Sequence, residues 1–162
     1  MDYKTFNEKK EKEFNEFINK YVVFAFGLNY DDFIKSFNKN MNEKFNDNSL
    51  TFDDFISIGN GGYLLNSKKN DWINLVNQYE KEYNELLNDD KFVYDLFYKT
   101  LSDHEYIITY DDLDVFYYSG FVNTYDDETF EKELNEIENK ERIIKIYNKA
   151  RKQYLKDYEK YN

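Results

Sequence analysis

The sequence predicts an α+β fold, mostly helical, in which a small antiparallel sheet packs against several amphipathic helices. Segments with apolar residues at helical spacing occupy most of the chain. A β-branched and aromatic run at residues 22–26 and a glycine-rich turn at residues 59–62 predict a strand and a β-hairpin. With 17 Tyr, 15 Phe and 1 Trp among 162 residues, we expect one core and a single domain over residues 1–162.

The N-terminal part predicts a helix, a strand and a second helix. Residues 3–21 carry one apolar stripe, which is typical of a helix that faces a core. The run at residues 22–26 contains only apolar residues and therefore favours a buried strand. Asn29 or Asp31 can cap a short helix that follows, and the Asn-rich residues 38–50 are predicted as a loop.

The middle of the chain predicts a hairpin followed by helices. Two apolar runs, residues 55–58 and 63–65, flank the glycine-rich turn, whose residues tolerate the positive φ angles of a tight hairpin. Helices are then expected from Asn66 or Ser67, near residues 92–101, and over residues 111–118, with a break at Gly120.

A long C-terminal helix is expected over residues 126–160. Phe130 and Leu134 lie on one apolar stripe, whereas Tyr147 and Tyr154 lie on another. The change of stripe indicates that the C-terminal end packs differently from the start of this helix, or projects from the body.

Composition limits the functional classes. Cysteine is absent, which excludes disulfides, thiol nucleophiles and Cys-ligated metals and is typical of a reducing compartment. The chain has no apolar run of the roughly 18 residues that a membrane span needs, and its first residues lack the plan of a signal peptide. We therefore expect a cytoplasmic protein with no membrane partner.

Charge is distributed asymmetrically. The net charge is −11, yet the eight basic and three acidic residues from position 140 onward give that segment a charge of +5, which leaves −16 for the rest. The acidic residues are densest between Asp103 and Glu138. A surface of this sign repels nucleic acid and attracts basic proteins.

The sequence contains no complete catalytic or cofactor-binding motif. The turn at residues 59–62 lacks the Gly-Lys-Ser/Thr of a phosphate loop. His104-Glu105 resembles the start of a zinc-protease motif, but the chain has no second histidine, and His104 is better explained by a helix-end or buried role. The carboxylates at 111–114 lack the glycine and terminal Glu of an EF-hand loop. We expect no catalytic residue, metal or cofactor.

Several motifs together resemble a known family. They are Val23-Phe24-Ala25-Phe26, Asp32-Phe33, Ser57-Ile58-Gly59 with Gly61-Gly62-Tyr63-Leu64, Phe92-Val93-Tyr94 with Phe97-Tyr98, and Asp103-His104-Glu105-Tyr106. In this order they resemble an uncharacterised family of small acidic proteins of bacteriophages and their hosts. The resemblance covers residues 22–118 and leaves the N-terminal and C-terminal helices outside. It implies a setting in which small acidic proteins inhibit host defence, as anti-CRISPR proteins do.

The leading hypothesis is a non-enzymatic inhibitor with an acidic binding surface. Its partner would be a host protein or ribonucleoprotein effector, plausibly a CRISPR complex, whose positively charged nucleic-acid channel the carboxylates occupy. The candidate acidic residues are Asp111, Asp112, Asp114, Asp126, Asp127, Glu128 and Glu131, and the candidate aromatic anchors are Tyr110, Tyr117, Tyr118 and Tyr125. The alternative role of this face is only to keep the protein in solution.

A second hypothesis places the function on the basic, Tyr-rich C-terminal helix. Lys145, Lys149, Arg151, Lys152 and Lys156 alternate with Tyr147, Tyr154 and Tyr158, a combination that could hold RNA by phosphate pairing and base stacking. The same helix could instead neutralise an acidic surface on its own body or on a second copy, giving a homodimer. We expect no direct nucleic-acid binding elsewhere. A third hypothesis is an enzyme that uses His104 and Glu105.

Overall fold

The computed structural model describes residues 1–105, 112–124 and 126–161, with only the backbone described at residues 112, 113, 160 and 161. The chain is mostly helical with a three-stranded antiparallel sheet, which confirms the α+β prediction. Its backbone contacts divide it into two compact units: a sheet unit of residues 8–82, and a helical unit of residues 1–7 with 83–162. The boundaries fall inside helices α1 (Tyr3–Tyr21) and α3 (Lys69–Leu86).

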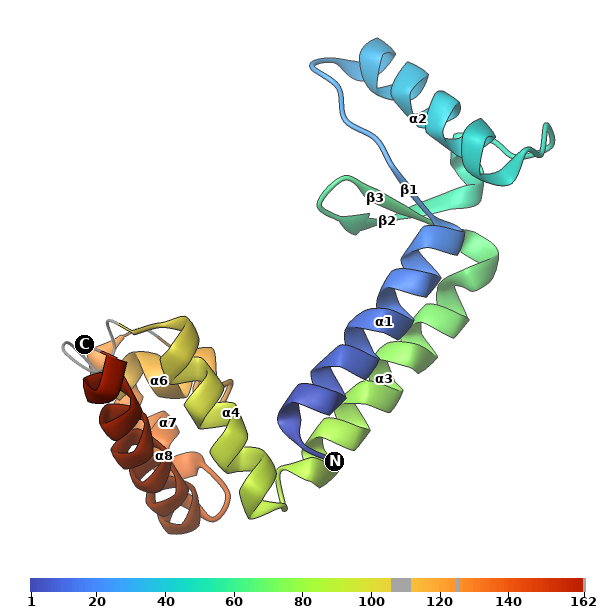
Figure 1. Cartoon of the computed structure of the whole chain (residues 1–162). Helices are drawn as coiled ribbons and strands as arrows, with labels where there is room; N and C mark the ends of the chain where they lie inside the picture. The colour runs from blue at the N-terminus through green and yellow to red at the C-terminus, as the bar shows by residue number, and fades with distance from the viewer. Residues whose placement is uncertain (106–111, 125, 162) are drawn as a thin grey trace. The chain divides into compact units, whose positions relative to one another are not determined.

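Within the sheet unit, α1 and α3 lie side by side (Figure 1). Trp72 on α3 packs edge-on against Phe14 of α1, with ring centroids 5.3 Å apart. Tyr79 on α3 donates a hydrogen bond from its phenol to the Glu13 carboxylate on α1. Burial is the main cause that raises the pKa of Tyr79 above its usual value, and the Glu13 carboxylate adds to it. The predicted helix over residues 3–21 is confirmed.

The sheet has the strand order β1-β3-β2. Strand β1 (Val22–Phe24) pairs with β3 (Gly62–Leu65), and β2 (Phe55–Gly59) pairs with the other side of β3. Gly59, Asn60 and Gly61 all have positive φ angles, so the glycine-rich turn forms the predicted hairpin. Two short 3₁₀ helices, η1 (Phe52–Asp54) and η2 (Asn66–Lys68), flank the hairpin.

Helix α2 (Tyr30–Phe45) covers one face of the sheet (Figure 1). The Asn29 side chain caps it by accepting a hydrogen bond from Asp32, as predicted. The core of this unit lies between α2 and the sheet and is largely aromatic. Its buried members are Val23, Ala25, Phe37, Met41 and Phe55, and Phe33, Phe45, Leu50, Phe52, Tyr63 and Leu65 pack around them.

The predicted loop over residues 38–50 is wrong for its first part, because α2 continues to Phe45. Residues 37, 41 and 45 lie four apart on the face that packs against the sheet, so they extend the helix despite the many asparagines around them. Asn46 ends the helix in the left-handed conformation, with φ 47°.

The helical unit contains α4 (Asp90–Asp103), α6 (Asp112–Tyr118), α7 (Asp127–Glu136) and α8 (Lys140–Tyr161). Helix α8 packs along α4, and its buried residues join those of α4 and α6 in a second core. The buried members are Val93, Phe97, Leu101, Val115, Phe116, Val122, Ile143, Ile146, Tyr147, Ala150 and Tyr154. The expectation of one core is therefore wrong, since each unit has its own cluster of buried apolar residues.

The expected long C-terminal helix is confirmed in α8, but its predicted extent over residues 126–160 is wrong, because the chain is broken between α7 and α8. Ile137 is extended with ψ 126°, and Asn139 has a positive φ of 56°. The break falls where the apolar stripe changes face, because α7 packs through Phe130 and Leu134 and α8 packs through a differently oriented set. The C-terminal half does not project from its unit.

Candidate functional site

Helix α7 presents an acidic face to solvent. Phe130, Leu134 and Ile137 pack against the core of the helical unit, which turns Glu128, Glu131 and Glu136 outward, where all three are exposed. Lys132, also exposed, is the one base in this helix. The face therefore concentrates carboxylates on a rigid element, although Lys132 lowers its net charge.

The first acidic residues of α7 also stabilise the helix. Asp126 is the N-cap, and its side chain accepts a hydrogen bond of 2.9 Å from the backbone N–H of Glu128. The Asp126 backbone N–H donates to the hydroxyl of Thr124 at 2.8 Å. Asp127 and Glu128 occupy the first turn, where negative charge interacts favourably with the helix dipole. Glu131 lies beyond that turn, so its exposed carboxylate has no such structural role.

The remaining predicted acidic residues form a less coherent group. Asp114 lies in α6 and is half-buried. Asp112 begins α6, but only its backbone is described. Asp111, Tyr110 and Tyr125 lie outside the described residues. Of the predicted acidic surface, the described residues therefore place the exposed carboxylates on α7 and its cap.

The two described aromatic candidates, Tyr117 and Tyr118, are engaged with other rings. Their own rings lie edge to face with centroids 5.3 Å apart. Tyr118 also stacks on His104, with centroids 3.9 Å apart and planes inclined by 14°. His104 is the C-cap of α4, which confirms its expected helix-end position. These contacts hold the tyrosines in place, and 41% of Tyr118 stays exposed.

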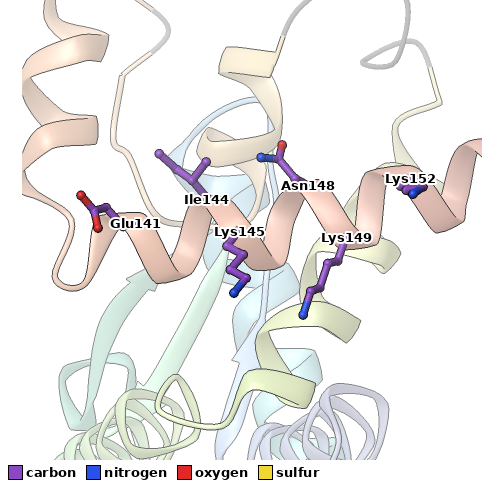
Figure 2. Close-up of a pocket in the computed structure, with 6 residues that line it drawn as sticks. All are labelled: Glu141, Ile144, Lys145, Asn148, Lys149 and Lys152. Atoms are coloured by element: carbon purple, nitrogen blue, oxygen red, sulfur yellow. The ribbon is translucent and has the colours of Figure 1, made fainter.

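Helix α8 carries a straight row of lysines on its exposed side. Lys145, Lys149, Lys152 and Lys156 are all exposed and are spaced by four, three and four residues, which places them on one line of the helix. Figure 2 shows Lys145 and Lys149 pointing the same way from this helix. We call these four residues the lysine row.

The lysine row borders a shallow hollow of about 460 Å³. The described residues that line this hollow all belong to α8: Glu141, Ile144, Lys145, Asn148, Lys149 and Lys152 (Figure 2). A hollow along a single helix cannot enclose a small molecule, but it can accept a second elongated surface. The geometry of α8 thus fits a macromolecule rather than a metabolite.

The aromatic part of the basic-helix hypothesis is wrong for two of its three tyrosines. Tyr147 and Tyr154 are only 3% and 6% exposed and belong to the core, so they cannot stack on bases. Tyr158 is exposed, whereas Arg151 is half-buried and does not lie on the line of the lysine row. What remains of that hypothesis is a row of positive charge and the exposed ring of Tyr158.

A set of exposed apolar residues on the sheet was not predicted as a functional surface. The run at residues 22–26 was expected to form a buried strand, but Phe24 is exposed and Phe26 is 69% exposed. Ile56 and Ile58 on β2 are also exposed. We call Phe24, Phe26, Ile56 and Ile58 the hairpin patch. The sequence signal was a strand that is apolar on both faces, which is equally typical of a fully buried strand.

A further cavity lies in the helical unit, where Arg142 and Asn84 are among its lining residues and its volume is about 530 Å³. The Arg142 guanidinium donates to the Leu87 carbonyl at 3.1 Å and to the Asp90 carboxylate at 2.6 Å. These bonds join the start of α8 to the start of α4, so the cation has a structural role. In the parts of the chain described, no three His, Cys, Asp or Glu residues are grouped to hold a metal ion.

Comparison with known proteins shows the family of the chain. Residues 2–153 match the model of a family of unknown function, DUF7659, and the chain belongs to that family. The match includes α1 and most of α8, so the expectation that these helices lie outside the family is wrong. No curated protein and no solved structure matches the chain. Within the described residues, no helix has the length and apolar character needed to cross a membrane.

Proposed function

We propose that this member of DUF7659 is a non-enzymatic inhibitor that binds a nucleic-acid-handling defence effector through the acidic face of α7. The observation that carries the proposal is the outward arrangement of Glu128, Glu131 and Glu136 on a helix fixed to a core by its opposite side. The resemblance to phage proteins makes a CRISPR effector complex the favoured partner, in the cytoplasm of the host cell.

The physical basis is competition for a basic channel. Effectors hold nucleic acid in channels lined by Lys and Arg, which bind phosphates largely through charge. Carboxylates on a rigid helix can bind the same Lys and Arg side chains. The complementary electrostatic potentials also accelerate encounter between the two proteins. A rigid helix also limits the entropy lost on binding.

The simplest rival explanation is that the face only keeps the protein in solution. The two explanations differ in specificity, because a solubilising face has no preferred partner and a binding face has one. Glu131 and Glu136 are the best probes, since neither is part of the cap or the first turn of α7.

The test is affinity capture from a bacterial host lysate with wild type and the variant Glu131→Lys/Glu136→Lys. We expect wild type to recover a nucleic-acid-handling protein and the variant to lose it. Glu11→Lys/Glu16→Lys is a matched control, because Glu11 and Glu16 are exposed on α1 and also lie five residues apart. Equal recovery by all three proteins, or loss with the α1 control alone, would contradict the proposal.

A second candidate function rests on the lysine row. Four exposed lysines on one helical line can pair with successive phosphates of a single strand. The net charge of −16 over residues 1–139 opposes this binding, which is why the acidic face is preferred. Anisotropy of a labelled RNA oligonucleotide tests it: binding should weaken with salt and be lost in Lys149→Glu/Lys152→Glu. Salt-dependent dimerisation lost in the same variant would instead assign the row to a second copy.

A further inference from the structure

We propose that the hairpin patch and the outer edge of β2 bind an extended, basic and amphipathic segment of a partner protein, which adds to the sheet as a fourth strand beside β2. This site lies within the sheet unit, whereas the acidic face of α7 belongs to the helical unit. It therefore goes beyond the proposed function and can be tested apart from it.

The hairpin patch is an apolar surface built over two glycines. Phe24 and Ile58 approach each other across Gly62, and both lie within 3.3 Å of the position that a Cβ atom would take there. The Phe26 ring covers Gly61 so closely that a Cβ atom would overlap it. Strand pairing places Phe24 opposite Gly62, so the patch lies on the face opposite α2, which packs against Val23 and Ala25.

Of the two edges of the sheet, α2 closes the one formed by β1. The Lys44 ammonium donates a hydrogen bond to the Val22 carbonyl, and the Asn40 amide donates to the Phe24 carbonyl at 2.6 Å. The outward carbonyls of β1 are thus already satisfied by α2 side chains. Burial lowers the pKa of Lys44, as expected for an ammonium group held against the sheet. This edge is protected against an additional strand.

On the edge formed by β2, the Phe55 N–H already donates to the Phe52 carbonyl, so the backbone groups open to an added strand, among the described residues, are those of Ser57. The backbone carbonyls of Val22 and Phe24 point away from β3, so the backbone groups of Val23 point toward β3, where Val23 pairs with Tyr63. Backbone groups of successive strand residues point to alternate sides, so those of Leu64 point toward β2, where Leu64 pairs with Ile56. The N–H and C=O of Ser57, the residue after Ile56, therefore point away from the sheet. These two groups lie beside the exposed side chains of Ile56 and Ile58. An added strand could use both the backbone groups and the apolar patch.

Charge selects the kind of strand. Asp53 and Asp54 directly precede β2, and Asp53 is exposed, whereas Lys44 lies at the opposite edge, formed by β1. An incoming strand with apolar residues on one face and basic residues on the other complements both the patch and these two carboxylates. A second copy of this chain would bring the same carboxylates to the edge, so like charges disfavour it.

The probe is a synthetic peptide in which valine and lysine alternate, measured by calorimetry together with amide hydrogen exchange. We expect it to bind, to slow exchange at Ser57, and to bind more tightly than a valine–glutamate peptide. Its affinity should also exceed that of a peptide of equal composition whose lysines are grouped at one end. Equal affinity for the glutamate peptide, or no protection of Ser57, would overturn the proposal.

Ser57→Pro removes the outward N–H, and Ser57→Ala keeps it. Proline at such a position leaves the pairing of β2 with β3 intact. We expect Ser57→Pro to weaken peptide binding about fivefold relative to Ser57→Ala, the effect of one backbone hydrogen bond. Ile58→Lys, which leaves the backbone unchanged, should weaken it as well. Unchanged affinity in both Ser57→Pro and Ile58→Lys would refute the site, and so would a dimer of wild type that Ser57→Pro abolishes.

The same peptide distinguishes this site from the acidic face of α7. Glu131→Lys/Glu136→Lys should bind the valine–lysine peptide as wild type does, because the two sites belong to different units. Loss of peptide binding in that variant would show that the peptide binds α7, and the proposed strand site would be wrong while the proposed function would stand.

Discussion

Tyr98 on α4 donates a hydrogen bond of 2.5 Å from its phenol to the carboxylate of Asp157 on α8. The other oxygen of that carboxylate accepts a bond of 3.0 Å from the Gln153 amide. The Asp157 carboxylate is the largest cause that raises the pKa of Tyr98 to about 12, and burial adds to it. The basic C-terminal helix is therefore bonded to the helix on which it packs.

Two phenols with raised pKa values, Tyr98 and Tyr83, predict a loss of stability at alkaline pH. The pKa of Tyr83 is raised to about 12 by burial. A phenol with a raised folded-state pKa stabilises the fold fully below its unfolded pKa, about 10, and loses that contribution as pH rises toward the folded pKa. We expect the free energy of unfolding in urea to fall between about pH 10 and 12. In Asp157→Asn, phenolate absorbance should show one tyrosine titrating nearer its usual pKa; an unchanged titration would contradict the assignment.

Phe97 is predicted to dominate the core of the helical unit. It is fully buried and its ring contacts Phe116, Phe121 and Tyr147. Phe97→Ala should cost about 3–5 kcal/mol of unfolding free energy, with faster hydrogen exchange in α4 and α8. Leu28→Ala, at a fully exposed position, is the control and should change stability by less than about 0.5 kcal/mol. Similar effects of the two changes would show that the core is assigned wrongly.

Gly61 is predicted to set the position of Phe26. Gly59 and Gly61 both have positive φ angles, so alanine at either should cost about 1 kcal/mol from backbone strain. Of these two positions, Gly61 is the one at which the added methyl group would also meet a side chain among the described residues, the ring of Phe26. The melting temperature of Gly61→Ala should therefore be lower than that of Gly59→Ala. Combining Gly61→Ala with Phe26→Ala should remove the additional loss that the contact with the ring causes. Equal melting temperatures for the two single variants would contradict this.

Metal removal is predicted to leave the protein unchanged. Its two cores consist of apolar and aromatic residues, and no disulfide or Cys-ligated metal can contribute to either. Thermal unfolding followed by circular dichroism should give the same melting temperature with and without EDTA. A lower melting temperature after chelation would show that a metal supports the fold.

The elements whose structure is determined by local sequence could be predicted. The apolar stripe of α1 and the positive-φ residues of the hairpin determine those elements locally, so both were predictable. The full length of α2 was also encoded in Phe33, Phe37, Met41 and Phe45, four residues apart, but asparagine-rich composition favoured a loop. Packing against the sheet decided in favour of the helix, which composition alone does not reveal.

Surfaces were harder to predict than elements. The carboxylates of α7 and the lysine row could be named because charge and spacing are visible in sequence. The burial of Tyr147 was indicated by the apolar stripe that it shares with Tyr154, although the basic-helix hypothesis required both to be exposed. The exposure of Phe26 could not be predicted, since it depends on which face of the strand is covered. The sequence does not distinguish an apolar strand residue whose face is covered by a helix from one whose face is exposed to solvent.

The acidic face of α7 is most directly tested by competition for nucleic acid. The measurement is fluorescence anisotropy of labelled nucleic acid bound to the purified effector that wild type captures, as the protein is added. We predict that wild type displaces the nucleic acid, that rising salt weakens the displacement, and that Glu131→Lys/Glu136→Lys fails to displace it while unfolding like wild type. Nucleic acid that stays bound, or is displaced equally well by that variant, would contradict the account.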